Sequence, residues 1–88
     1  MKIKKIYYTK NFERKVRKLP SVLKSEIEKR EQLFIEDPFN PTLKTHKLKS
    51  RLKNLWTFSI SFKQRILFEF VNKNKVLFFD VGGHEIYD

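Results

Sequence analysis

The first 20 residues carry the apolar spacing of a short strand followed by a helix. Apolar and aromatic side chains gather in residues 3–8, which predicts the strand. Thr9 can then cap a helix, because a threonine hydroxyl accepts a hydrogen bond from a backbone N–H of the first helical turn. Phe12, Val16 and Leu19 follow at intervals of four and three, so one face of this helix is expected to pack inward.

The opposite face of this first helix is strongly basic. It carries Lys10, Arg14, Lys15, Arg17 and Lys18. A charged outer face is the normal state of an amphipathic helix, and it also fits a ridge that contacts a nucleic-acid backbone. The sequence leaves both interpretations open.

A second helix is predicted between Ser21 and Asp37. Pro20 stops the first helix, and Ser21 can cap the second. The inward face of this helix carries three apolar residues, Leu23, Ile27 and Phe34. The prolines within residues 37–41 end it, because each one disfavours helical geometry in the residue before it. The two helices together are expected to form an αα hairpin.

From Leu55 onward the apolar period changes to two, and β-branched and aromatic residues predominate. Three strands are predicted, over residues 55–61, 65–71 and 75–81. The segment 72–74, Asn-Lys-Asn, predicts a tight turn between the last two, because asparagine tolerates the positive φ of hairpin turns. We therefore expect a single α+β domain over residues 1–88, with the N-terminal strand and αα hairpin packed on a mainly antiparallel twisted sheet of about four strands.

Charge and cysteine content narrow the choice of partner and compartment. The chain has 20 Lys and Arg against 10 Asp and Glu, a formal net charge of +10, which favours RNA, DNA, ribosomes or an acidic protein as partner. Cysteine is absent, so disulfides and thiolate zinc sites are excluded and a cytoplasmic location is expected. The N-terminus lacks the apolar run of a signal peptide, and no segment approaches the roughly 20 apolar residues of a membrane span.

Two histidines and an arginine offer the groups that metal-free RNA cleavage requires. That reaction needs a base for the ribose 2′-hydroxyl, a cation for the phosphorane and an acid for the leaving 5′-oxygen. His46, Arg65 and His84 are the candidates, because imidazole can accept or donate a proton near neutral pH. The histidines and scattered carboxylates do not form a closely spaced ligand set, so neither a metal nor another cofactor is expected.

Each candidate has a structural alternative that the sequence leaves open. His46 also fits a polar loop residue among basic neighbours. His84 follows the glycine pair at 82–83, which fits a close approach to a ligand at a sheet end as well as a plain C-terminal turn. Arg65 can contact a phosphate with its planar fork or pair with a carboxylate such as Glu69.

Several short motifs follow one another along essentially the whole chain. They are Asp37-Pro38, Leu-Lys-Thr-His-Lys-Leu at 43–48, Trp56 before Ser-Ile-Ser at 59–61, Arg-Ile-Leu-Phe at 65–68, and Gly-Gly-His-Glu-Ile-Tyr at 82–87. In this order they resemble the RelE/ParE superfamily of type II toxins, most closely its YafQ-like and YoeB-like branches. The resemblance implies a RelE-like microbial RNase fold and an mRNA interferase: an endoribonuclease toxin that cleaves mRNA in the ribosomal A site and inhibits translation.

The resemblance also implies roles for the candidate residues. His46 matches a catalytic histidine of YafQ-like members and a catalytic glutamate of YoeB-like members, implying proton abstraction from the 2′-hydroxyl. Arg65 matches the YoeB-like arginine at the phosphate, and His84 matches the C-terminal histidine of both branches, the implied general acid. Lys47 and Lys49 resemble lysines that hold the RNA backbone in RelE-like members.

Further RNA contacts are expected from the remaining positive charges and the last aromatic residue. They are Lys44, Arg51, Lys53, Lys63 and Tyr87. The tyrosine fits either a ring that stacks on a base or a side chain that closes the hydrophobic edge.

The chain departs from the YafQ-like pattern at two positions. Gln64 stands where those members have an acidic residue, and Asp80 stands where they have an arginine. ParE-like toxins of the same fold act on DNA gyrase and generally lack the catalytic set. A non-enzymatic gyrase poison, a ribosome- or RNA-binding module and an inactive toxin are therefore the alternatives.

The resemblance implies three partners. The ribosome and mRNA are the targets, and the third partner is an antitoxin encoded alongside. Its acidic or amphipathic C-terminal segment would wrap the toxin and cover the basic groove, through charge complementarity and strand or helix addition.

Overall fold

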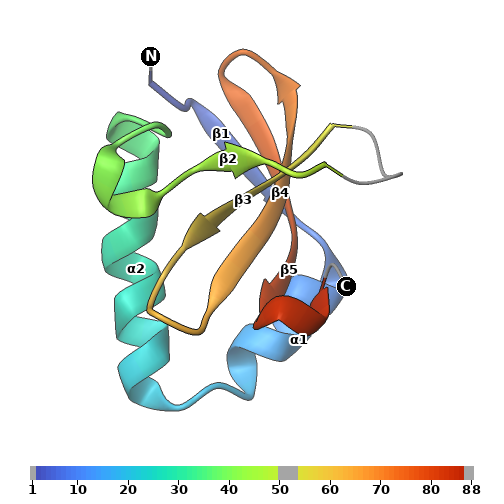
Figure 1. Cartoon of the computed structure of the whole chain (residues 1–88). Helices are drawn as coiled ribbons and strands as arrows, with labels where there is room; N and C mark the ends of the chain where they lie inside the picture. Colours follow the sequence, from blue (N-terminus) through green and yellow to red (C-terminus); the bar gives the residue numbers. More distant parts are fainter. Residues whose placement is uncertain (1, 50–53, 87–88) are drawn as a thin grey trace.

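The computed structural model describes residues 2–49 and 54–86 (Figure 1). In chain order its elements are β1 (Lys5–Tyr8), α1 (Lys10–Arg17), α2 (Ser21–Glu36), the 3-10 helix η1 (Pro41–Leu43), β2 (His46–Lys47), β3 (Leu55–Ser59), β4 (Arg65–Asn72), β5 (Lys75–Gly82) and the 3-10 helix η2 (His84–Ile86). The predicted α+β class is confirmed. No helix in the described ranges is long and apolar enough to cross a membrane.

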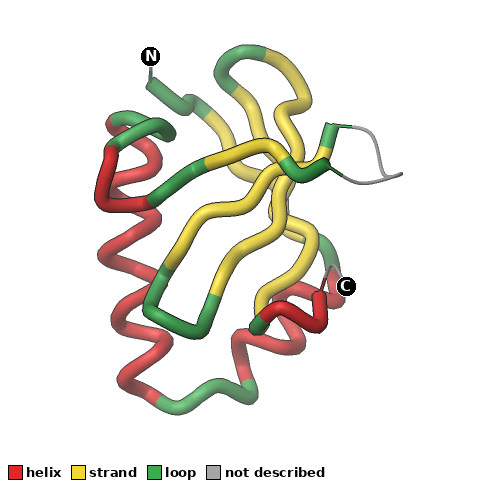
Figure 2. Tube along the Cα trace, viewed as in Figure 1, coloured by secondary structure: helices red, strands yellow, loops and turns green. Residues whose placement is uncertain are grey.

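The strands form one sheet in the order β1-β5-β4-β3-β2 (Figure 2). The sheet has five strands and not about four, because the two-residue strand β2 pairs with the edge of β3. β3, β4 and β5 pair antiparallel, as predicted, and β2 also pairs antiparallel with β3, whereas β1 runs parallel to β5. A parallel pair cannot be joined by a tight turn, and here nearly the whole chain intervenes between the two strands.

Of the two predicted helix N-caps, one is confirmed and the other is wrong. The Thr9 hydroxyl accepts a hydrogen bond from the Phe12 backbone N–H at 3.0 Å, so the predicted N-cap of α1 is confirmed. The predicted Ser21 cap is wrong, because Ser21 is already the first residue of α2 and Pro20 stands at the cap position without a side-chain hydrogen bond. The fixed φ of proline suits this junction, since it ends α1 and lets α2 begin directly after it.

Aromatic rings hold the helices to the sheet. The Phe34 ring of α2 stacks on Phe58 at a centroid distance of 4.7 Å and meets Phe68 and Phe78 edge-on at 4.9 and 5.6 Å. Phe12 of α1 also meets Phe78, at 5.4 Å. Both helices therefore pack against the same ring of β5, and the sheet residues at the period-two positions form the core.

The turn between β4 and β5 occurs as predicted, but for a different reason. Neither of its asparagines has a positive φ, since the non-glycine residues with positive φ in the described ranges are Lys44 and Asn54. Instead, the Asn72 side-chain oxygen accepts a hydrogen bond from the Asn74 backbone N–H at 3.0 Å. This contact, in which asparagine imitates a backbone turn, closes the hairpin.

Candidate functional site

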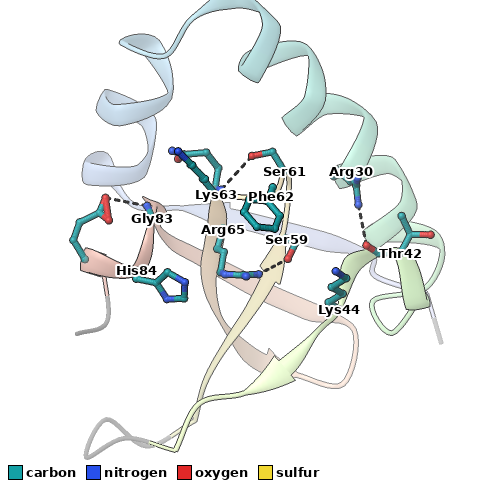
Figure 3. Close-up of a pocket in the computed structure, with 12 residues that line it drawn as sticks. Arg30, Thr42, Lys44, Ser59, Ser61, Phe62, Lys63, Arg65, Gly83 and His84 are labelled. Carbon is teal, nitrogen blue, oxygen red and sulfur yellow. Dashed lines mark hydrogen bonds between the residues drawn. The ribbon is translucent and has the colours of Figure 1, made fainter.

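A basic pocket of about 780 Å³ lies where the β3–β4 turn approaches the end of β5 (Figure 3). It brings together four of the predicted site residues: Lys44, Lys63, Arg65 and His84. They come from the end of η1, from the β3–β4 turn, from the start of β4 and from the start of η2. The pocket therefore gathers positive charge from segments far apart in the sequence.

Arg65 is positioned by the sheet and by one buried hydroxyl. It pairs with Ser59 on β3 and with Gly82 on β5. Its guanidinium Nη1 donates a hydrogen bond to the hydroxyl of Ser59, which is buried. In the part of the chain that the structure describes, no carboxylate forms an ion pair with Arg65, so the predicted alternative of a pair with Glu69 is not observed. The other guanidinium N–H groups can therefore serve an anion in the pocket.

The glycine pair after β5 allows η2 to fold closely against the strand end. A Cβ on Gly82 would lie 2.7 Å from Ile86 Cγ2, and one on Gly83 would lie 2.8 Å from Glu85 Oε2. Neither glycine has a positive φ, and the closest backbone atom to either Cβ is the Lys63 carbonyl oxygen, 3.4 Å from the Cβ on Gly83. The Gly83 N–H also donates to Glu85 Oε1 at 2.9 Å, and this hydrogen bond lowers the pKa of the exposed Glu85 carboxyl.

The resulting turn explains why His84 lies in the same pocket as Arg65. Gly82 is the β5 partner of Arg65, and His84 follows two residues later as the first residue of η2. The imidazole and the guanidinium both line the pocket (Figure 3). Nineteen positions separate the two residues in sequence, and the pairing of β4 with β5 brings them together in space.

His46 lies on the edge strand β2 and not in a loop. It is exposed and is not among the residues that line the pocket. Its Nδ1 is 2.9 Å from the carbonyl oxygen of Lys44. Because a carbonyl oxygen only accepts, this contact places the proton of a neutral ring on Nδ1 and leaves the lone pair on Nε2.

The strand register nevertheless puts His46 on the same face of the sheet as Arg65. His46 pairs with Thr57, and Ser59 pairs with Arg65. Directly paired residues share a face, and so do residues two apart along one strand. Thr57 and Ser59 are two apart, so the four side chains lie on one face of the sheet.

The other predicted RNA-binding residues are distributed as follows. Lys44 and Lys63 line the pocket, whereas Lys47 and Lys49 are exposed and do not. Arg51, Lys53 and Tyr87 lie outside the described residues. Among the residues that the structure describes, no group of three His, Asp or Glu side chains could hold a metal ion.

The two departures from the YafQ-like pattern have different surroundings. Asp80 does not line the pocket and is paired with α1, since Lys15 Nζ lies 2.6 Å from its Oδ1. The same oxygen accepts the Val81 backbone N–H at 2.8 Å. Gln64 does line the pocket. Asp80 therefore connects β5 to the basic face of α1.

Eight of the twelve described residues that line this pocket were not predicted as site residues, and Arg30, Ser59 and Phe62 are among them. The Arg30 guanidinium forms an ion pair with Glu26 of the same helix at 3.0 Å. It also donates a hydrogen bond to the Thr42 carbonyl oxygen at 2.9 Å, and this bond links α2 to η1. The strands predicted over residues 55–61 and 65–71 leave Phe62 in the connection between them. The available signal was the position of this large aromatic residue next to Lys63, in a connection between two strands.

Comparisons with proteins of known structure show which fold this chain has. No protein-family model and no curated protein matches the chain. Among solved structures it is similar to YafQ from E. coli strain BL21(DE3), with 16% identity over 94% of this chain and 97% of that one and a TM-score of 0.75. It is also similar to a YoeB/ParE toxin from Agrobacterium tumefaciens, with 14% identity, 92% and 99% coverage and a TM-score of 0.76.

A third similar structure is the archaeal RelE-RelB complex from Pyrococcus horikoshii OT3. The identity is 12%, the coverage is 94% of this chain and 96% of that one, and the TM-score is 0.73. The three similarities each span nearly the whole of both chains, with the elements in one spatial arrangement. The chain therefore has the fold of the RelE/ParE toxins, the YafQ-like and YoeB-like proteins among them.

Proposed function

We propose that this protein is the toxin of a type II toxin-antitoxin system, a ribosome-dependent endoribonuclease that cleaves mRNA and inhibits translation in the cytoplasm. The observation that carries the proposal is the presence of Arg65 and His84 in one basic pocket. A phosphate bound in this pocket would meet a planar cation and an imidazole together. The fold shared with YafQ, YoeB/ParE and RelE supports the assignment.

The proposed reaction needs no metal. The ribose 2′-oxygen attacks the adjacent phosphorus as its proton passes to a base, and the bond to the 5′-oxygen breaks as an acid protonates that oxygen. The products are a 2′,3′-cyclic phosphate and a 5′-hydroxyl. Arg65, oriented by Ser59, would stabilise the phosphorane, and protonated His84 would supply the proton to the leaving group.

His46 is the proposed base. Strands lie about 4.8 Å apart and rise about 3.3 Å per residue, so the register separates the Cα atoms of His46 and Arg65 by roughly 12 Å. Two side chains on one face can reach the two sides of a ribose-phosphate unit across that span. The proton on Nδ1 is directed to the Lys44 carbonyl, which leaves Nε2 as the acceptor for the 2′-hydroxyl proton.

An antitoxin is the proposed protein partner. DinJ binds YafQ and RelB binds RelE in the solved complexes. The formal charge of +10 favours an acidic partner segment. Such a segment would block access of mRNA by covering the pocket that Arg65 and His84 line.

The test compares cleavage by three variants on translating ribosomes, with the cuts mapped by primer extension. Arg65→Ala and His84→Ala should each lower the cleavage rate by roughly 10²-fold or more, because each removes a group that stabilises the transition state. Lys73→Ala is the matched control, since it removes a positive charge from the turn at the other end of the β4–β5 hairpin. Near-normal cleavage by Arg65→Ala and His84→Ala would overturn the proposal, and inhibition of DNA gyrase would favour the ParE-like alternative.

A further inference from the structure

Phe62 is exposed to solvent in a way that its residue type does not favour. Its exposed fraction is 92%, the highest of the large hydrophobic residues in the described ranges. It lies in the turn between β3 and β4 and lines the same pocket as Arg65 and His84 (Figure 3). The ring adds exposed apolar surface to the rim of a site that polar and charged side chains otherwise line.

The turn that carries Phe62 is held by hydrogen bonds on both sides. The backbone N–H groups of Ile60 and Ser61 both donate to the Gln64 carbonyl, at 3.0 and 3.3 Å. The Gln64 N–H donates in return to the Ser61 hydroxyl at 3.1 Å. Ile60 is fully buried, so it anchors the turn in the core, and Phe62 and Lys63 form the tip. The backbone of the turn that carries the ring is therefore held at the rim by local hydrogen bonds.

The surroundings of Phe62 favour a nucleic acid over an apolar protein surface. Phe62 is the one large apolar side chain among the described residues that line the pocket, and its neighbours there include Lys44, Lys63 and Arg65. The one carboxylate in the lining, Glu85, accepts the Gly83 N–H. A flat ring beside clustered cations matches single-stranded RNA, in which a base can stack while the adjacent phosphate meets the charges.

We propose that Phe62 is a substrate-binding platform on which the nucleobase next to the scissile phosphate stacks. Lys63, its neighbour in the turn, and Arg65 would hold the phosphate on the 3′ or 5′ side of that base. The inference rests on the proposed ribonuclease function and adds a contact to it. Stacking on an aromatic face is tolerant of base identity, so Phe62 contributes affinity and register and little base preference.

Binding of short RNA tests the proposal without the ribosome. The probe is a fluorescent 2′-O-methyl hexanucleotide, which cannot be cleaved because its 2′-oxygen carries no proton. A second set of probes has the same sequence with one base removed at each position in turn. Phe62→Ala should weaken binding of the intact probe by about 10-fold, within the range measured for stacked bases. Phe62→Trp should bind like the parent, because indole keeps the aromatic face.

The base-removal series makes the test specific. One abasic position should weaken binding to the parent by a similar factor and have little effect on Phe62→Ala, since the two changes remove the same contact. Val71→Ala is the matched control, because Val71 is an exposed apolar residue near the far end of β4. Thermal unfolding of Phe62→Ala should match the parent, as expected for a side chain with so few contacts.

Three outcomes would overturn the inference. One is equal RNA affinity for Phe62→Ala and the parent, and another is an abasic penalty that persists in Phe62→Ala. The third is a loss of antitoxin affinity in Phe62→Ala with unchanged RNA affinity, which would assign the ring to a protein interface. Failure of the proposed function gives a different result: Arg65→Ala and His84→Ala would then leave ribosomal cleavage or growth arrest unchanged, whatever Phe62→Ala does to RNA binding.

Discussion

The hydrogen bond from Arg65 to Ser59 predicts that a buried hydroxyl controls the rate of cleavage. Ser59→Ala removes the acceptor while leaving the guanidinium in place. Ser59 is buried and Arg65 is partly exposed, so water can replace the lost partner on the arginine side. A hydrogen bond to a charged group contributes about 1.5–3 kcal/mol, and the solvated arginine argues for the lower end of that range.

This energy translates into an expected change in rate. About 1.4 kcal/mol of transition-state stabilisation corresponds to a tenfold change, so Ser59→Ala should lower the cleavage rate by roughly tenfold. That loss is smaller than the roughly 10²-fold or larger loss expected for Arg65→Ala. Ser25→Ala is the matched control, since Ser25 is an exposed serine of α2, and it should leave the rate unchanged.

The double variant separates orientation from a general structural effect. If Ser59 acts only by orienting Arg65, Ser59→Ala should cost nothing further once Arg65 has become alanine. Single-turnover cleavage of mRNA on purified ribosome complexes measures all four rates. The reasoning would be refuted if Ser59→Ala cleaved at the rate of the parent. It would also be refuted if the fold-loss of rate in the double variant equalled the product of the fold-losses in the two single variants.

Two further predictions concern His46 and Asp80. His46→Glu should recover more ribosomal cleavage activity than His46→Ala, with the acidic limb of the pH–rate profile moved to lower pH, because a carboxyl ordinarily has a lower pKa than imidazole; equal rates in both variants and the parent would exclude His46 as the base. Asp80→Asn should lower the free energy of unfolding by about 0.5–1 kcal/mol in urea titrations, through loss of its partly exposed ion pair with Lys15, and should leave cleavage unchanged; a loss of cleavage without a loss of stability would place Asp80 in the site.

Residue patterns determined the parts of this fold that depend on near neighbours. The N-cap at Thr9 and the inward faces of both helices follow from contacts three or four residues apart. The strands β3, β4 and β5 follow from a period of two between short connections. Such patterns act within one element or one hairpin, so they are visible without knowledge of the rest of the chain.

The tertiary structure decided which distant segments meet. The sequence contains no pattern that pairs β1 with β5, adds β2 to β3 or joins Asp80 to Lys15. The chemistry of Arg65 and His84 was recognisable from residue type and resemblance, whereas their common pocket depends on the pairing of Arg65 with Gly82. Phe62 is a further case, because the sequence leaves it between two predicted strands, whereas its exposure at the pocket depends on the hydrogen-bonded turn between β3 and β4. Periodicity reports which face a residue takes while the strand continues, and the point at which the strand ends depends on contacts across the sheet.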